Sequence, residues 1–204
     1  MPAPHHFRSP RRLRGVIAPL LLAAAAVLGG CQPSPFQHSD ISKAGYEGQL
    51  SLTDQHGQRR TLEDFKGKVV ALFFGYTQCP DVCPISLATM STVMSLLGEA
   101  RDQLQVVFVS VDPERDTPEL LAEYMPAFDA SFIGLYGTAE ETARAAQAFR
   151  VIYQKSGDLQ GHYTVDHSAG TFLIDPQGRL RLYVRYGASA ESIAADIRAL
   201  LAGH

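Results

Sequence analysis

Three short runs of almost entirely apolar residues constrain the fold of this 204-residue chain more than any other feature. They span residues 68–75, 105–111 and 171–174 and are rich in β-branched and aromatic side chains. Runs of this length and composition are typical of buried strands. Because polar residues do not alternate with the apolar ones, we expect a sheet that is covered on both faces.

Two further patterns predict β-hairpins. The last apolar run is followed by an Asp-Pro-Gln-Gly turn at 175–178 and by a partner strand at 180–185. Nearer the N-terminus, the segments 49–52 and 59–62 flank an Asp-Gln-His-Gly turn. A strand, a turn and a second strand in this order are typical of a hairpin.

Helical patterns lie between the strands. Apolar residues recur at spacings of three and four within 87–97 and again within 193–201, and each set forms one stripe on a helix. The Thr-Pro-Glu sequence at 117–119 and the capping-box pair Thr138 and Glu141 mark the starts of two more helices.

Strands that alternate with helices, followed by a closing hairpin and helix, predict the α/β class. We expect a thioredoxin-like fold, with a central mixed β-sheet flanked by helices and an added N-terminal β-hairpin. The chain length suits one such domain, which we place at residues 41–204.

Residues 1–30 have the pattern of a secretory signal peptide. Four arginines and no acidic residue accompany an apolar run at 16–28, which is short for a membrane span. Leu-Gly-Gly before Cys31 resembles a bacterial lipobox, in which the cysteine is lipidated and becomes the new N-terminus; an uncleaved N-terminal anchor is the alternative. In both cases we expect export to the periplasmic side and attachment to a membrane, with residues 31–40 as a lipidated, flexible tether.

The charge and the cysteine count exclude two classes of protein. Loss of residues 1–30 removes four arginines and no acidic residue, so the formal net charge of −3 becomes −7. An acidic domain of this kind does not favour a nucleic-acid partner. Three cysteines are too few for a disulfide scaffold, and Cys31 is assigned to the lipid anchor.

The other two cysteines, Cys79 and Cys83, lie in a loop between the first apolar run and the first striped helix. In open α/β sheets this position collects ligands and catalytic groups, and the positive end of the helix dipole favours a thiolate at Cys83. If the loop is helical, the i, i+4 spacing places the side chains about 5–6 Å apart. That separation suits two ligands of one soft metal ion and also permits a disulfide; two structural cysteines are the plainer alternative.

A metal site with two thiolates usually needs a further ligand, and His167 is the candidate. It precedes the run at 171–174, so its loop can approach the cysteine loop. Asp166 is expected to orient the imidazole as an outer partner. A surface or core histidine is the alternative, and it is the interpretation that we prefer for His162.

Three sequence blocks resemble the Sco/SenC family. They are Phe-Phe-Gly-Tyr-Thr-Gln-Cys-Pro-Asp-Val-Cys-Pro at 73–84, Ser-Val-Asp-Pro-Glu-Arg-Asp-Thr-Pro at 110–118, and Asp-His before a strand that ends in Asp-Pro-Gln-Gly at 175–178. With its lipobox, the chain looks like a bacterial lipoprotein form of that family. The resemblance implies a thioredoxin-like fold, copper binding and a role in assembling the dinuclear copper centre of cytochrome c oxidase. It also implies that Cys79, Cys83 and His167 are the copper ligands.

Two functions follow from this ligand set. Thiolates select Cu(I) and imidazole also accepts Cu(II), which is consistent with the role that the resemblance implies. That role is a metallochaperone that delivers copper to subunit II of the oxidase, with another periplasmic copper chaperone as a candidate donor. The alternative is an enzyme, a thiol-disulfide oxidoreductase with Cys79 and Cys83 as its redox pair. Three residues between the cysteines, and Ser168 to Gly170 where thioredoxin-type reductases have a proline, favour metal binding. Zinc and a thiol peroxidase activity are weaker alternatives.

The second block carries a cluster of charges that we do not assign to the metal. Asp112, Glu114, Arg115 and Asp116 follow a predicted strand. We expect a solvated cluster whose ion pairs fix a loop.

Overall fold

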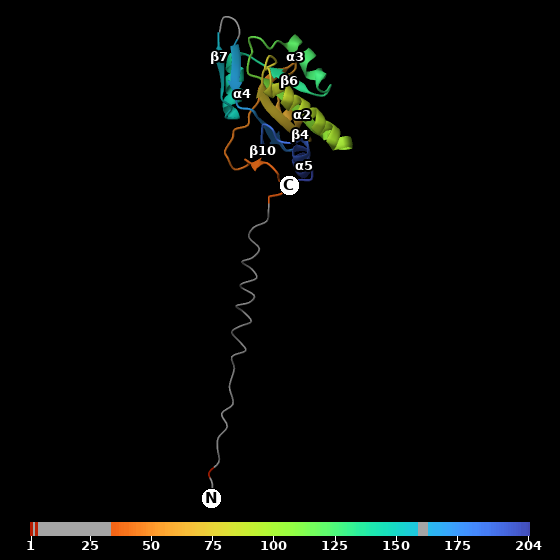
Figure 1. The fold of residues 1–204 in the computed structure, drawn as a ribbon, viewed down its shortest axis with the longest axis vertical. Helices are drawn as coiled ribbons and strands as arrows, with labels where there is room; N and C mark the ends of the chain where they lie inside the picture. The colour runs from red at the N-terminus through yellow and green to blue at the C-terminus, as the bar shows by residue number, and fades with distance from the viewer. Residues whose placement is uncertain (2, 4–33, 159–162) are drawn as a thin grey trace. The chain divides into compact units, whose positions relative to one another are not determined.

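The computed structural model describes residues 1, 3, 34–158 and 163–204. The predictions for the signal peptide and for Cys31 concern residues outside this described part. A compact unit spans Pro35–His204, and its centre is a mixed sheet of eight strands among the described residues, in the order β1-β10-β9-β4-β5-β6-β2-β3 (Figure 1). The strands of the sheet are β1 Ser39–Asp40, β2 Ser51–Asp54, β3 Arg59–Thr61, β4 Val69–Gly75, β5 Leu104–Ser110, β6 Ile133–Tyr136, β9 Gly170–Ile174 and β10 Leu180–Arg185.

The remaining elements are helices and one separate pair of strands. Strands β7 Tyr153–Gly157 and β8 Tyr163–His167 form a two-stranded antiparallel sheet. The α-helices are α2 Val82–Leu97, α3 Pro118–Tyr124, α4 Ala139–Ala148 and α5 Ala190–Leu201, and short 3-10 helices span Leu62–Phe65, Gly98–Gln103 and Met125–Ala127.

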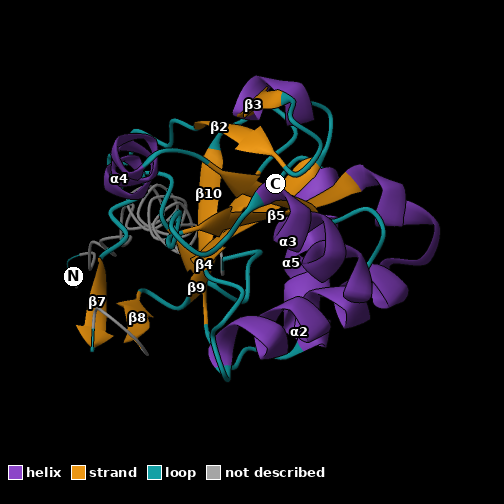
Figure 2. Cartoon of the chain, turned by 90° about the horizontal axis from the view of Figure 1, so that it is seen from above, coloured by secondary structure: helices purple, strands orange, loops and turns teal. Residues whose placement is uncertain are grey.

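The sheet is covered on both faces, as the apolar strand runs predict. Strands β4, β5 and β6 are parallel neighbours, and β9 runs antiparallel to β4. Figure 2 shows α2, α3 and α5 on one side of the sheet and α4 on the other. All seven residues of β4 and all seven of β5 are buried, because helices leave neither face open to water.

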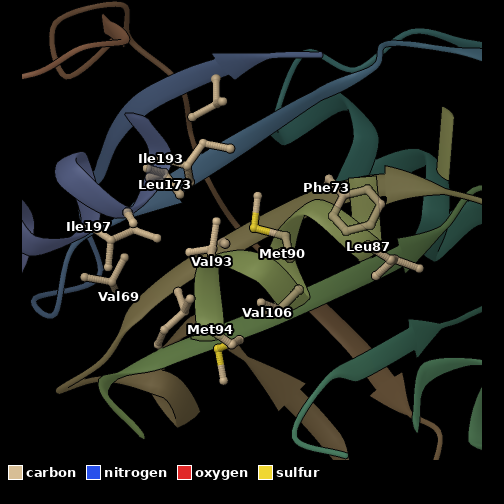
Figure 3. Packing of buried hydrophobic residues seen from close by; sticks show 14 of the residues in the cluster. Val69, Phe73, Leu87, Met90, Val93, Met94, Val106, Leu173, Ile193 and Ile197 are labelled. Carbon is tan, nitrogen blue, oxygen red and sulfur yellow. The ribbon is translucent and has the colours of Figure 1, made fainter. Parts of the chain in front are cut away.

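The core under α2 and α5 joins helix stripes to the sheet. Met90 and Val93 of α2 meet Ile193 of α5 and Phe73 of β4 in one cluster of buried side chains (Figure 3). The segment Val82–Gln103 is long and apolar enough to cross a membrane by length and composition. Its apolar stripe is buried in this core, so within the domain it is a core helix.

The predicted elements are present, and the structure adds others. Both predicted hairpins form, as β2–β3 and β9–β10. The capping box at the start of α4 is made by Thr138 and Glu141, whose side chains each accept the backbone N–H of the other residue. Strands β1, β6, β7 and β8 were not predicted. Strands β7 and β8 carry exposed residues at alternate positions and lack the long apolar run that reveals β4.

The N-terminal boundary differs from the predicted one. The compact unit begins at Pro35, so residues 35–40, expected to be tether, belong to the folded body. Phe36 is buried in the core beneath the sheet. The buried carboxylate of Asp196 accepts the backbone N–H groups of Gln37 (2.7 Å) and His38 (3.0 Å), and its Oδ2 lies 2.7 Å from Nδ1 of His38. An apolar side chain and a buried acceptor therefore fix a segment whose polar composition suggested flexibility.

Candidate metal centre

The two cysteines lie at the carboxyl end of β4, where the chain turns into α2. Gly75 ends β4, and Cys83 is the second residue of α2. The backbone N–H of Cys79 donates to the carbonyl of Tyr76 (3.2 Å), which closes the first turn of the loop. Cys79 is half-buried and Cys83 is buried, and both are free thiols. One sulfur is thus accessible while the other lies against the core.

Gly75 permits the close approach of the Cys83 side chain to the strand. A Cβ atom at position 75 would lie 2.6 Å from Sγ of Cys83 and 2.7 Å from Cε2 of Phe108. Neither distance is compatible with an unchanged structure, because carbon and sulfur at van der Waals contact are well over 3 Å apart. The missing side chain therefore makes room for the sulfur between β4 and β5.

His167 reaches the cysteines from the end of β8. Its Nε2 lies 3.6 Å from Sγ of Cys83, and its Nδ1 lies 3.0 Å from the carbonyl oxygen of Val165. A carbonyl can only accept, so Nδ1 is the protonated nitrogen and Nε2 of the neutral ring carries a lone pair. The ring edge packs on Tyr76, with the two centroids 5.8 Å apart. The free nitrogen of His167 therefore points to the cysteine loop, as a metal ligand requires.

Asp166 is not placed as expected. It is exposed, whereas its neighbours Val165 and His167 have lower exposure, as the alternation of a strand dictates. The carbonyl of Val165 orients the imidazole in the place proposed for the Asp166 carboxylate. A backbone carbonyl is a common partner of a ligating histidine, and nothing in the sequence distinguishes it from a neighbouring acid.

The thiol of Cys83 is not poised as a thiolate. Burial raises the pKa of the Cys83 thiol well above its ordinary value, and the nearby Cys79 raises that pKa further. The raised pKa of Cys83 is opposite to the lowering expected from its position at the helix N-terminus. The desolvation of a buried sulfur outweighs the helix dipole here, so a cation bound at the site would supply the charge that stabilises the thiolate.

The described residues contain no group of three or more His, Cys, Asp or Glu side chains already arranged as a metal shell. Cys83 and His167 are in contact, and Cys79 lies near enough to Cys83 to affect its pKa. Binding of an ion by all three would thus require an adjustment of the exposed side of the cysteine loop. The donor set of two sulfurs and one imidazole suits a soft metal such as copper.

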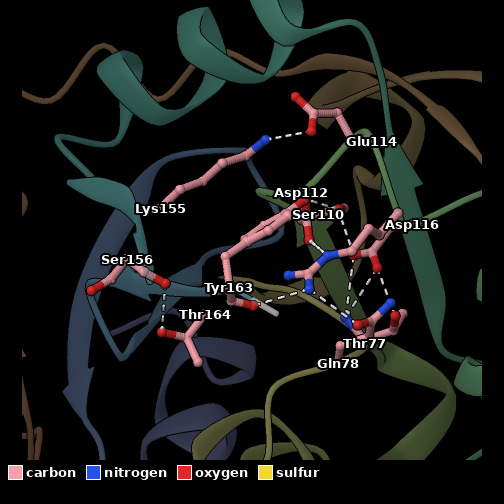
Figure 4. A network of polar contacts seen from close by, with 11 residues as sticks. Thr77, Gln78, Ser110, Asp112, Glu114, Asp116, Lys155, Ser156, Tyr163 and Thr164 are labelled. Atoms are coloured by element: carbon pink, nitrogen blue, oxygen red, sulfur yellow. Dashed lines mark hydrogen bonds and ion pairs between the residues drawn. The ribbon is translucent and has the colours of Figure 1, made fainter. Parts of the chain in front are cut away.

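Asp116 fixes the cysteine loop through hydrogen bonds. Its carboxylate accepts the backbone N–H and the hydroxyl of Thr77, at 3.2 and 2.6 Å, and the hydroxyl of Ser110 at 2.6 Å (Figure 4). Asp116 is 2% exposed, and burial raises its pKa although these hydrogen bonds oppose the shift. The loop that carries Cys79 is therefore fixed two residues before the cysteine.

Arg115 joins the cysteine loop to the strand of His167. Its guanidinium donates to the side chain of Gln78 (3.1 Å) and to the carbonyl of Tyr163 (3.0 Å), and it lies 3.6 Å from the centroid of the Tyr163 ring. Its Nε donates to Asp112, and the hydroxyl of Tyr163 donates to the same carboxylate at 2.7 Å. Arg115 and Asp112 thus bridge two segments that are remote in sequence.

The expectation of a solvated charge cluster was therefore wrong for two of its members. Asp112 and Asp116 are both buried, whereas Glu114 is exposed and pairs with Lys155 of β7. The expected ion pairs do form, and they fix two loops rather than one. Gly75, Tyr76 and Tyr163 also shape the site and were not singled out; a glycine at the end of an apolar strand, next to a cysteine loop, was a usable signal for the first.

Comparison with known proteins agrees with this site. The sequence model of the SCO1/SenC family matches residues 38–202. The mitochondrial SCO2 homologue of Danio rerio is 40% identical over 156 residues, which cover 74% of this chain and 56% of that protein; the chain thus spans just over half the length of this relative. A copper-bound structure of ScoI from Bradyrhizobium japonicum has a TM-score of 0.70 and 40% identity, and the match covers 75% of this chain and 98% of ScoI.

A more distant structure shows the same fold. BsSco, described as a member of the Sco family of cytochrome c oxidase assembly proteins and studied for a disulfide switch, has a TM-score of 0.63 at 23% identity, over 78% of this chain and 95% of BsSco. These structural matches confirm the predicted thioredoxin-like architecture. The family match extends over all three blocks that form the site, and the chain belongs to the SCO1/SenC family.

Proposed function

We propose that this protein is a copper metallochaperone that holds copper between Cys79, Cys83 and His167 and delivers it to the dinuclear copper site of cytochrome c oxidase. The observation that carries the proposal is the contact of 3.6 Å between Sγ of Cys83 and Nε2 of His167, with Nδ1 already engaged. A related ScoI has been seen with copper bound, and the donor set matches that metal.

Delivery is a ligand exchange. Copper binding displaces the thiol protons of Cys79 and Cys83, and release returns protons to them as bonds form between copper and the sulfur or nitrogen atoms of the acceptor. No electron is transferred if the ion stays Cu(I). The half-buried Cys79 offers the sulfur that an incoming ligand can reach first, and an incomplete shell permits stepwise exchange.

The acceptor is expected to be subunit II of the oxidase, and a second periplasmic copper chaperone is a candidate donor. We also infer a lipid anchor at Cys31, which would hold the domain at the periplasmic face of a membrane. Mass spectrometry of the mature N-terminus tests this anchor: a diacylglyceryl group on Cys31 is expected, and an intact residue 30–31 bond would contradict it.

The alternative is a thiol-disulfide oxidoreductase that keeps the acceptor cysteines reduced. Both cysteines are free thiols and close together, and BsSco was studied for a disulfide switch. Cys79 would attack, because the pKa of Cys83 is raised by burial and a buried thiol is a poor nucleophile. His167 has no evident part in such an exchange.

Replacement of His167 by alanine separates the two functions. We expect His167→Ala to weaken Cu(II) binding by about tenfold or more and Cu(I) binding much less, because two thiolates alone hold the softer ion. Titration of both oxidation states into the purified wild-type and variant proteins measures this. An unchanged Cu(II) affinity would remove His167 from the ligand set.

The same variant also tests the role in cells. A metallochaperone predicts that His167→Ala lowers the yield of assembled, copper-loaded oxidase, even with both cysteines intact. Cys79→Ser serves as the control, because it disables both functions. Full oxidase assembly with His167→Ala but none with Cys79→Ser would favour the thiol-based role.

A further inference from the structure

A groove opens directly beside the proposed copper ligands. Cys83 and His167 line it together with apolar side chains from α2, from β4 and β10, and from the loop that leads into α5. Met90 and Val184 form part of its floor, and Ser86 and Thr89 are polar groups along α2. The groove therefore offers one approach to the side of the site formed by Cys83 and His167.

Two exposed apolar side chains line the groove. Ile85 at the start of α2 is 47% exposed, and Tyr186 at the end of β10 is 45% exposed, and both line the groove. Ile152 is 78% exposed, and its carbonyl accepts the backbone N–H of Ser168, the residue after His167. Two of the large apolar side chains left open to water thus line the groove that His167 also lines, and the backbone of a third is bonded next to His167. Clusters of this kind mark surfaces that bind other molecules.

The groove also carries an unbalanced positive charge. Arg185 lines it and is exposed. Within the described part of the chain its guanidinium forms no ion pair, whereas Arg179 and Arg181 of the same hairpin both pair with Asp175. The chain as a whole is acidic without residues 1–30. A free cation at an apolar groove therefore favours a partner that places a carboxylate there.

We propose that this groove is the docking surface for the copper acceptor, and that it receives an apolar side chain of that polypeptide with a neighbouring carboxylate on Arg185. The inference rests on the proposed function and adds the surface and the chemistry of the partner. Docking there would bring the ligands of the acceptor to the side of the site where Cys83 and His167 line the groove. Its apolar contacts with Ile85 and Tyr186 would supply affinity, and Arg185 would speed and orient the encounter.

The test uses groove variants that leave the copper ligands intact. Ile85→Ser, Tyr186→Ser and Arg185→Glu are compared with two controls that change an exposed residue elsewhere in the same way: Leu96→Ser at the far end of α2, which is 39% exposed, and Arg144→Glu on α4. The purified protein is loaded with Cu(I), and two quantities are measured. One is the Cu(I) dissociation constant, and the other is the rate of transfer to the copper-free soluble domain of cytochrome c oxidase subunit II.

We expect each groove variant to slow transfer by about tenfold or more, with Cu(I) affinity within about twofold of the wild type, and both controls to transfer normally. A further variant, Arg185→Gln, removes the charge without reversing it. Its transfer rate is expected to depend less on salt concentration than that of the wild type. Groove variants that transfer as fast as Leu96→Ser would overturn the docking surface. The docking surface would also be overturned if the variants lost Cu(I) affinity in proportion to the transfer rate, because the groove residues would then only hold the copper ligands in place.

The failure of the inference is distinguishable from the failure of the proposed function. A wild-type protein that transfers Cu(I), together with groove variants that transfer it equally fast, would overturn the docking inference and leave the proposed function intact. A wild-type protein that binds Cu(I) tightly but passes none to the subunit II domain would overturn the delivery step of the proposed function. A wild-type protein that binds no copper would overturn the proposed function.

Discussion

At the scale of single residues, the site depends on atoms that are absent as much as on those present. Gly75 has no Cβ, and the space it leaves is taken by Sγ of Cys83. His167 has the required free nitrogen because a backbone carbonyl engages the other one. Neither feature is an interaction between charged groups. The ligand geometry is thus set by packing and by one hydrogen bond.

Replacement of Gly75 by alanine tests the packing. The added methyl group would meet Cys83 and Phe108 at 2.6 and 2.7 Å, so we expect a loss of about 1–3 kcal/mol in the free energy of unfolding. Displacement of Cys83 should also weaken Cu(I) binding by about tenfold. Chemical denaturation and copper titration measure the two effects.

Gly134 of β6 supplies the matched control. A Cβ there would also be crowded, at 3.0 Å from Cγ of Met125, but it touches neither cysteine. Gly134→Ala should lower stability without a change in copper affinity. If both variants lower affinity equally, the effect of Gly75 comes from general destabilisation and not from the placement of Cys83.

At the scale of elements, the site is made where three separate pieces of chain meet. The charged residues of the segment after β5, at 112–116, hold both the cysteine loop and the β7–β8 hairpin. Since β8 pairs with β7 alone and lies outside the main sheet, its position depends on such contacts. Arg115 contacts both segments, because a planar guanidinium can stack on a ring and donate in several directions at once.

Arg115→Lys should therefore loosen the hairpin that carries His167. Lysine keeps the charge but cannot bind Asp112, Gln78 and the Tyr163 carbonyl together. We expect faster amide hydrogen exchange in β8 and a loss of about 1–3 kcal/mol in the free energy of unfolding.

The control for this substitution is Arg150→Lys. Arg150 also lies over an aromatic ring, that of Tyr46, and donates to the carbonyl of Gly45 (2.9 Å), but it does not contact the cysteine loop. Hydrogen exchange in β8 should be unchanged in that variant. Equal protection of β8 in wild type and Arg115→Lys would show that the hairpin is held by its apolar contacts instead.

At the scale of the whole molecule, residues 35–40, the last part of the expected tether, complete the fold. Phe36 enters the core shared by α2 and α5, and β1 adds an edge strand to β10. Asp196 on α5 is 1% exposed, and its carboxylate accepts hydrogen bonds from the backbone N–H groups of Gln37 and His38. Without that segment the buried carboxylate of Asp196 would lose these hydrogen-bond donors, and a buried acceptor without donors lowers the stability of the fold.

A chain that begins at residue 41 should consequently be less stable than one that begins at residue 35. The loss of Phe36 burial is worth about 1.5–3 kcal/mol, and an unsatisfied Asp196 adds about 1–3 kcal/mol. Denaturant unfolding of the two chains measures the difference. His38→Ala in the longer chain removes one of the donors and should have an intermediate effect. Equal stabilities would mean that residues 35–40 do not contribute to folding and that the domain starts near Ile41.

The sequence alone determined the class of fold, both hairpins, the helices that bear apolar stripes and the three residues proposed as ligands. The elements depend on local signals, whereas His167 was named as a ligand through the resemblance of three sequence blocks to the Sco/SenC family. An apolar run such as residues 69–75 is buried wherever it folds, a capping box marks a helix start by its own spacing, and Cys79 and Cys83 are recognisable by their distance along the chain.

Only the tertiary structure decided which side chains surround the proposed ligands and what protonation they favour. Burial overrides the helix dipole at Cys83, the carbonyl of Val165 takes the part expected of Asp166, and Asp112 and Asp116 are interior anchors rather than solvated charges. The physical reason is common to all three. Desolvation and hydrogen bonding depend on what packs around an atom, and those neighbours come from segments that are remote in sequence.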